Sequence, residues 1–159
     1  MTALGVTGHQ TIPPDAREFV VTAVRDILRH MEPPLNAVTS LAAGADQLVA
    51  TELLRAGGRL HVIVPSGNYE QTFAAGEDLA CFRSLLEAAH VVTRLEYTEP
   101  SEEAFLTAGQ SVVDNCDVLI AVWDGKPARG LGGTADIVRY ARGTGKSVNI
   151  VWPEGIDDR

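Results

Sequence analysis

The sequence is poor in cysteine, and its two cysteines argue against a fold that depends on disulfide bonds. Cys81 and Cys116 are far apart in the 159 residues and form no CxxC pair. Both fall in segments with helical periodicity, which favours buried free thiols over a disulfide or a metal role. Free thiols fit a reducing compartment.

Long apolar segments are also missing. No segment approaches the roughly 20 apolar residues that a membrane-spanning helix requires. A strand pattern begins at Ala3 without the basic and apolar regions of a signal peptide. We therefore expect a cytoplasmic protein that does not insert directly into a membrane.

Positive charge is scarce. The chain has 13 Lys and Arg against 21 Asp and Glu, which gives a formal net charge of -8. Because an acidic surface repels a phosphate backbone, the composition predicts no nucleic-acid partner. A small anion remains compatible with a locally positive pocket.

Apolar segments alternate with amphipathic ones along the whole chain. Strands are predicted at residues 3–6, 37–41, 60–64, 91–95, 118–122 and 147–152. Helical spacing occupies most of the segments between them, at about 13–31, 44–56, 78–89, 101–116 and 134–142. Near-continuous apolar strands between helices indicate a mainly parallel sheet with helices on both faces. We expect one three-layer, Rossmann-like α/β domain over residues 1–155 and a polar tail over 156–159.

Loops that follow parallel strands share one edge of the sheet, where ligands of open α/β sheets bind. Here these loops cover residues 7–10, 40–44, 65–67 and 124–134. The last ends in Gly130-Leu131-Gly132-Gly133-Thr134, immediately before a helical pattern. We predict that Gly132, Gly133 and Thr134 hold a phosphate through backbone N–H groups and the helix N-terminus. A merely flexible connection is the alternative.

Candidate polar residues lie at the same edge, and each has a structural alternative. Asp46 and Asp136 each lie in a first helical turn, so either could hold a ribose or simply favour the helix start. Asp136, Asp124 and His9 are the candidate catalytic groups. Asp124-Gly125 is alternatively a turn, and a lone histidine is often structural.

Small residues mark the remaining candidates. Gly8, Ser40 and Gly44 would let a ligand approach the backbone, or would serve tight packing between helix and strand. Pro65 follows a predicted strand, and Tyr69 either closes over a base or packs under its own loop.

Two familiar nucleotide motifs are absent, and no metal or other cofactor is indicated. No GxGxxG follows the first strand, which argues against a conventional NAD oxidoreductase. The segment Gly143–Ser147 resembles the end of a P-loop, but Tyr140 stands where that motif needs glycine, so we interpret it as a helix C-cap. His30, His61 and His90 have no partners at the spacing of metal ligands.

Taken together, SLAAGAD at 40–46 and GLGGTAD at 130–136 resemble motifs of the SLOG superfamily, the Rossmann-like group that joins DprA with the LOG hydrolases. The resemblance spans nearly the whole chain. It is strongest to a bacterial branch with a GVTGH start, a GAD turn, a loop with proline and tyrosine, and a WDGKP segment before GGT. Members of that branch look like sensors of nucleotide-derived ligands.

Two functions follow from these residues and the resemblance. The first is a sensor module that binds a nucleotide or an ADP-ribose-like ligand. A homodimer is compatible with this function. The second is an N-glycosidase or deoxyribosyltransferase-like enzyme, in which Asp136 or Asp124 stabilises the sugar or activates water and His9 protonates the leaving base. The resemblance implies a catalytic glutamate where this chain has Asp136, and the shorter side chain favours binding.

Overall fold

A computed structural model describes residues 2–127 and 133–156, in which strands and helices alternate as expected. The strands are β1 (Ala3–Gly8), β2 (Asn36–Thr39), β3 (Arg59–Ser66), β4 (Val91–Tyr97), β5 (Val118–Val122) and β6 (Ser147–Ile150). The α-helices are α1 (Pro14–Arg29), α2 (Ala45–Arg55), α3 (Glu77–Glu87), α4 (Glu102–Asp114) and α5 (Thr134–Gly143). A short 3-10 helix, η1 (Tyr69–Thr72), occupies part of the loop expected between β3 and α3.

The strands form one parallel sheet in the order β4-β3-β2-β1-β5-β6. β1 lies at its centre, where Gly5 pairs with Val38 of β2 on one side and with Leu119 of β5 on the other. β2, β3 and β4 therefore follow in turn on one side of β1, and β5 and β6 lie on its other side. This confirms the predicted α/β class.

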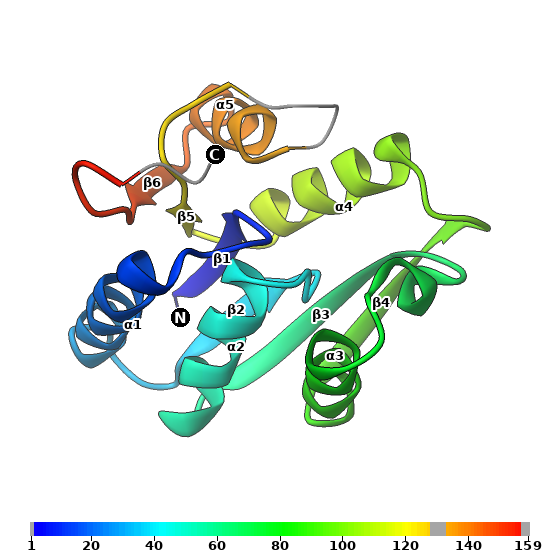
Figure 1. Ribbon diagram of the computed structural model, residues 1–159, viewed down its shortest axis with the longest axis horizontal. Helices are drawn as coiled ribbons and strands as arrows, with labels where there is room; N and C mark the ends of the chain where they lie inside the picture. The colour runs from blue at the N-terminus through cyan, green and yellow to red at the C-terminus, as the bar shows by residue number, and fades with distance from the viewer. Residues whose placement is uncertain (1, 128–132, 157–159) are drawn as a thin grey trace.

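Helices cover both faces of this sheet. α1, α2 and α3 lie on one face, and α4 and α5 lie on the other (Figure 1). The first face buries a cluster that includes Val6 and Leu53, and the second buries one that includes Ile63 and Leu119. Burial of apolar side chains on both faces explains why the strands read as near-continuous apolar segments.

The Gly143–Ser147 segment ends α5, as the sequence indicated. Gly145 has a φ of 79°, and the Lys146 N–H donates to the Ala141 carbonyl at 2.9 Å. This is the usual way in which a left-handed glycine closes a helix. The Lys146 ammonium donates to the Cys116 carbonyl at 2.7 Å, so it tightens the packing beside β5 and is not available as a phosphate-binding lysine.

Pro65 lies buried within β3, which extends two residues beyond its predicted end. Val64 pairs with Arg94 and Ser66 with Tyr97, so Pro65 alone faces the two residues Leu95 and Glu96 of β4. Proline has no N–H to give to the ladder, and a bulge in the neighbouring strand accommodates this loss. Pro65 is thus part of the sheet and not of the loop beyond it.

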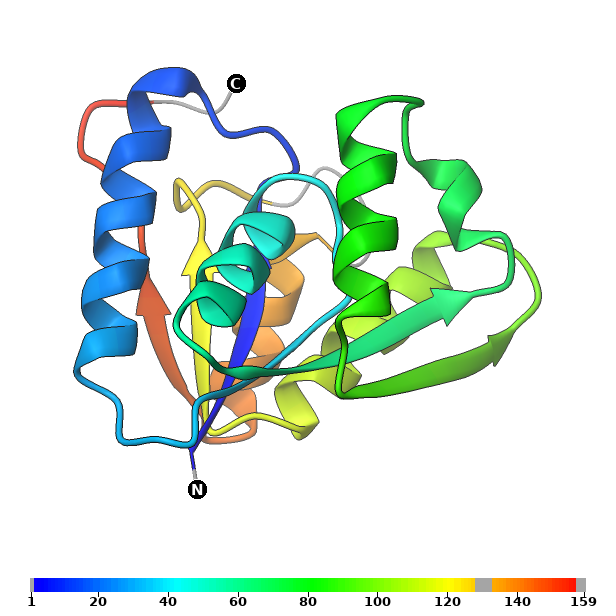
Figure 2. The same ribbon diagram turned by 90° about the horizontal axis from the view of Figure 1, so that it is seen from below.

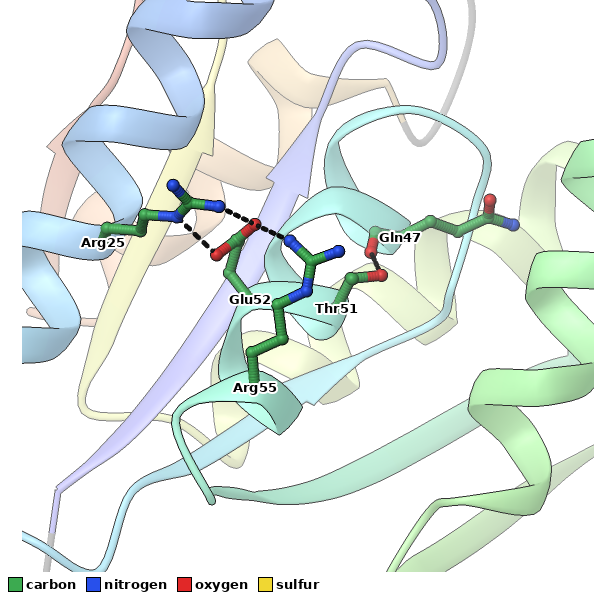
Figure 3. A network of polar contacts seen from close by, with 5 residues as sticks. All are labelled: Arg25, Gln47, Thr51, Glu52 and Arg55. Atoms are coloured by element: carbon green, nitrogen blue, oxygen red, sulfur yellow. Dashed lines mark hydrogen bonds and ion pairs between the residues drawn. The ribbon is translucent and has the colours of Figure 1, made fainter.

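A buried carboxylate ties α1 to α2. Glu52, 6% exposed, accepts hydrogen bonds from Arg25 at 2.8 and 3.3 Å and from Arg55 at 3.1 Å (Figure 3). Hydrogen bonding from Arg25 is the main cause that lowers the pKa of Glu52 below its usual value. The carboxylate therefore stabilises the fold above the unfolded-state pKa, and this stability is lost as the pH falls through the lower, folded-state pKa.

We expect Glu52→Gln to lower the free energy of unfolding at pH 7 by about 1–3 kcal/mol, because Arg25 and Arg55 both lose a charged acceptor. As the pH falls below about 4.5, the wild type should lose stability that the variant does not lose, because the carboxyl group of the unfolded chain takes up a proton before the native one does. Urea unfolding from pH 3 to 7 measures both effects. Glu87→Gln, at an exposed glutamate of α3, is the control; equal effects of the two changes would contradict the role of Glu52.

Candidate functional site

The strand order reverses between β1 and β5, and this reversal defines the candidate site. The chain leaves β1 toward α1 on one face and leaves β5 toward α5 on the other (Figure 2). In open α/β sheets, the crevice that binds ligands lies outside the carboxyl ends of the strands at a reversal of this kind. His9 follows β1 and Asp124 follows β5, so two of the three predicted catalytic residues lie at this point.

His9 and Asp124 contact each other where the strand order reverses. The Asp124 backbone N–H donates to His9 Nε2 at 3.0 Å, and the same nitrogen lies 3.3 Å from Asp124 Oδ1. Nε2 accepts a hydrogen bond in the first contact, which assigns the ring proton of a neutral His9 to Nδ1. The ring also packs edge-on against Trp152, with centroids 5.1 Å apart. His9 is thus held on two sides.

The carboxylate of Asp124 is buried but only half satisfied. Its side chain is 2% exposed. Oδ1 accepts the Lys126 N–H at 3.0 Å, whereas Oδ2 has no hydrogen-bond partner among the described residues. An unsatisfied buried carboxylate oxygen costs free energy until a donor reaches it. A ligand hydroxyl or amino group would supply that donor.

Gly8 and Gly44 allow two loops to meet beside this pair. A Cβ on Gly44 would lie 2.4 Å from the His9 carbonyl oxygen, and one on Gly8 would lie 2.6 Å from the Ala45 Cβ. The Ala45 N–H donates to the His9 carbonyl at 3.0 Å. Both glycines therefore fulfil the packing alternative, and they position His9 through its backbone.

The buried side chain of Asp46 stabilises the turn between β2 and α2 by accepting hydrogen bonds from it. It is 7% exposed, and Oδ2 accepts the Ala42 N–H at 3.2 Å. Burial raises the pKa of Asp46 to about 7, although hydrogen bonds from Ala42, Thr39 and Ser40 oppose the rise. The carboxyl group serves this turn, so the ribose-binding role predicted for Asp46 has no support from its contacts.

Tyr69 is a core residue. It is 6% exposed, and its ring packs edge-on against Phe73 and Phe82 with centroids 5.2 and 5.5 Å apart. Its hydroxyl donates to the Ser40 carbonyl at 3.0 Å. Tyr69 thus packs under its own loop, as the alternative prediction held. The Ser40 hydroxyl oxygen is buried without a partner among the described residues.

The start of α5 contributes the remaining predicted residues. Gly133 is its N-cap, Thr134 its first residue and Asp136 lies in its first turn. The Asp136 carboxylate accepts a hydrogen bond from Arg139 at 3.3 Å, and the backbone N–H of Asp136 donates to the Gly133 carbonyl. Gly125 is exposed with a φ of 87°, as a turn requires. Gly132 lies outside the described residues, so the phosphate-binding role of this loop stays a prediction.

Trp152 is the contact that the sequence analysis missed. It follows β6, and the topology places residues after β6 at the same edge as His9. A tryptophan at the carboxyl end of a predicted parallel strand was the available signal. Among residues 2–127 and 133–156, no three His, Cys, Asp or Glu side chains are grouped to hold a metal ion. No helix in these ranges is long and apolar enough to cross a membrane.

No protein-family model and no curated protein matches the chain, but solved structures do. DprA from Helicobacter pylori, reported for a unique single-stranded DNA binding mode, aligns over 94% of this chain and 64% of its own, with a TM-score of 0.68 and 17% identity. DprA from Streptococcus pneumoniae aligns over 99% and 52%, with a TM-score of 0.67 and 19% identity. The TM1055 protein aligns over 93% and 72%, with a TM-score of 0.57 and 18% identity.

The chain shares its fold with the two DprA chains and with TM1055. It spans 52% and 64% of the two DprA chains, so the shared fold is one part of those longer proteins. The expectation of no nucleic-acid partner is contradicted, because a DprA that shares the fold binds single-stranded DNA. The physical error lies in the use of net charge. The sum of all charges on the protein does not describe the local groups that a DNA strand contacts.

The approach of the two loops is testable at Gly44. We expect Gly44→Ala to destabilise the protein by about 2–4 kcal/mol, because the added methyl group meets backbone atoms and the backbone has a φ of 79°. Gly57→Ala is the matched control: its φ is 81° but a Cβ there meets nothing within 4 Å. Thermal unfolding measures both, and equal losses would show that φ alone matters.

The pKa of Asp46 predicts a second effect. Because its folded-state pKa of about 7 lies above the unfolded value, the native state binds more protons, and the stability of the wild type falls as the pH rises from about 4 to 7. Asp46→Asn should remove this contribution, which is at most about 1.4 kcal/mol per pH unit. Urea unfolding at several pH values measures this contribution. If the free energy of unfolding changes with pH in the same way for both proteins, the raised pKa does not belong to Asp46.

Proposed function

We propose that this protein binds one nucleotide unit, either free or within a single strand, in the crevice between β1 and β5. The observation that carries the proposal is the buried Asp124 carboxylate at the point where the strand order reverses: its Oδ2 receives no hydrogen bond from the described part of the chain. A sugar hydroxyl or the amino group of a base provides such a donor. The α5 N-terminus opens onto the same edge and favours a phosphate.

The comparisons support this class of ligand. The two DprA structures have this fold, and the Helicobacter pylori protein binds single-stranded DNA. A nucleotide unit is what a free nucleotide and a strand have in common. Binding without turnover, the role of a sensor, fits a site in which Asp124 is fixed by the Lys126 N–H and by the contact with His9.

Cleavage of an N-glycosidic bond is the second candidate, and one observation favours it. His9 and Asp124 form a buried pair of titratable groups, with 11% and 2% of their side chains exposed. Such a pair can move a proton between a ligand and the protein. In that case Asp124 activates water or stabilises the sugar, and His9 protonates the leaving base.

A single panel tests both candidates. Ribonucleoside and deoxyribonucleoside monophosphates, ADP-ribose and an oligothymidylate are mixed with the protein, and the melting temperature and released base are recorded in the same samples. We expect a rise in melting temperature without base release. Release of base would favour the enzyme, and a response to the oligothymidylate alone would show that the unit must be part of a strand.

Asp124→Asn should weaken binding by about 10- to 100-fold, because the variant has no charged oxygen at the Oδ2 position to accept the hydrogen bond from the ligand. Asp78→Asn removes the same charge from an exposed site on α3 and serves as the control. Titration calorimetry with the best ligand of the panel measures both variants. If the two bind equally well, Asp124 does not hold the ligand.

A further inference from the structure

Trp152 is held firmly at the carboxyl edge of the sheet, two residues after β6 ends. The Val151 N–H donates to the Ala121 carbonyl of β5 at 2.8 Å, so the chain is still anchored to the sheet one residue before Trp152. The indole Nε1–H donates to the Ile156 carbonyl at 2.7 Å, and Gly155, with a φ of 79°, lets the chain turn back toward the ring. Because its backbone and its ring N–H are both fixed, the indole has a defined position.

This indole restricts the orientation of the His9 ring. The two rings meet at 78° with their centroids 5.1 Å apart, which is the edge-to-face arrangement that aromatic pairs prefer. The backbone of His9 is already fixed, since its N–H donates to the Val122 carbonyl and its carbonyl accepts the Ala45 N–H, each at 3.0 Å. The freedom that is left to His9 is rotation of its side chain, and the contact with Trp152 limits that rotation.

The orientation of the His9 ring decides whether its hydrogen bond to Asp124 forms. The lone pair of Nε2 lies in the plane of the imidazole, so the ring must point its edge at the Asp124 N–H to accept it. The 3.0 Å distance between the two nitrogen atoms shows that it does. A ring turned out of this plane would take the acceptor away from the Asp124 N–H and loosen the backbone that carries the Asp124 carboxylate.

We propose that Trp152 is a positioning residue of the candidate site. It holds His9 in the plane in which Nε2 accepts the Asp124 N–H, and it thereby holds Asp124 where a ligand meets it. Three loops are joined in this way, those that follow β6, β1 and β5. The effect on a ligand rests on the proposed nucleotide binding, whereas the orientation of His9 and Asp124 does not, so the two claims are tested separately.

Three variants separate the ring contact from general packing. Trp152→Leu removes the aromatic ring, whereas Trp152→Phe keeps an aromatic ring and loses the hydrogen bond to Ile156. Phe82→Leu is the matched control, because it removes a ring of α3 that is 1% exposed and belongs to the apolar cluster against which Trp152 packs. Thermal unfolding verifies that all three variants remain folded.

The first readout is NMR of the isotope-labelled imidazole rings and backbone amides at about pH 8.5, where imidazoles are neutral. His9→Gln assigns the His9 signals. The wild type should carry the His9 ring proton on Nδ1 and protect the Asp124 amide from hydrogen exchange, because both follow from the hydrogen bond at Nε2.

Trp152→Leu should speed exchange of the Asp124 amide by about 3- to 10-fold, the factor that an edge-to-face contact contributes. It should also move the Nε2 resonance of His9 toward that of a free imidazole. Trp152→Phe and Phe82→Leu should resemble the wild type. The proposal is overturned if the wild-type ring proton is on Nε2, if Trp152→Leu leaves both signals unchanged, or if either of the other variants changes them as much.

The second readout is calorimetric titration of the same proteins with adenosine monophosphate. Trp152→Leu should bind it about 3- to 10-fold more weakly than the wild type, and Phe82→Leu should bind it equally well. Equal binding by Trp152→Leu and the wild type would overturn the effect of Trp152 on the ligand. If no protein binds this nucleotide while the NMR signals respond as expected, the nucleotide site is wrong and the positioning of Asp124 by Trp152 stands.

Discussion

The close approach of the loops after β1 and β2 is the constraint on which the candidate site depends. Without side chains at Gly8 and Gly44, the start of α2 reaches the end of β1, and the Ala45 N–H binds the His9 carbonyl. This contact fixes the backbone of His9, and the ring then meets Asp124 across the gap to β5. A methyl group at either glycine would push the two loops apart.

Buried polar groups near this contact fall into two kinds. Asp46 and Tyr69 are satisfied within the protein, and they hold the β2–α2 turn from opposite sides through Ala42 and Ser40. Asp124 Oδ2 and the Ser40 hydroxyl have no partner among the described residues. The first kind stabilises the shape of the turn, and the second leaves a buried oxygen without a donor, which is the basis of the proposed ligand site. Hydrogen-bond satisfaction thus distinguishes these polar groups where residue type does not.

The sequence predicted the element types well, because strands buried on both faces and amphipathic helices have different periodicities. It also placed His9 and Asp124 at one edge, since parallel strands with helical crossovers allow no other arrangement. It did not predict that they face each other, because this depends on the order of the strands, and no local pattern encodes that β5 lies beside β1.

Two alternatives that the sequence left open also depend on long-range contacts. Whether Tyr69 covers a ligand or fills the core is decided by Phe82 and Phe105, which lie more than ten residues along the chain. Whether Gly44 serves a ligand or a neighbouring loop is decided by the carbonyl of His9. Net charge misled for a related reason, because it averages over surfaces that a ligand never touches.

The central claim is that a nucleotide unit satisfies Asp124 in the crevice between β1 and β5. A crystal structure with a bound nucleotide tests this most directly. The account predicts that the ligand lies between His9 and the start of α5, with a hydroxyl or amino group donating to Asp124 Oδ2. A nucleotide bound elsewhere on the sheet, or one that leaves Oδ2 without a donor, would contradict it.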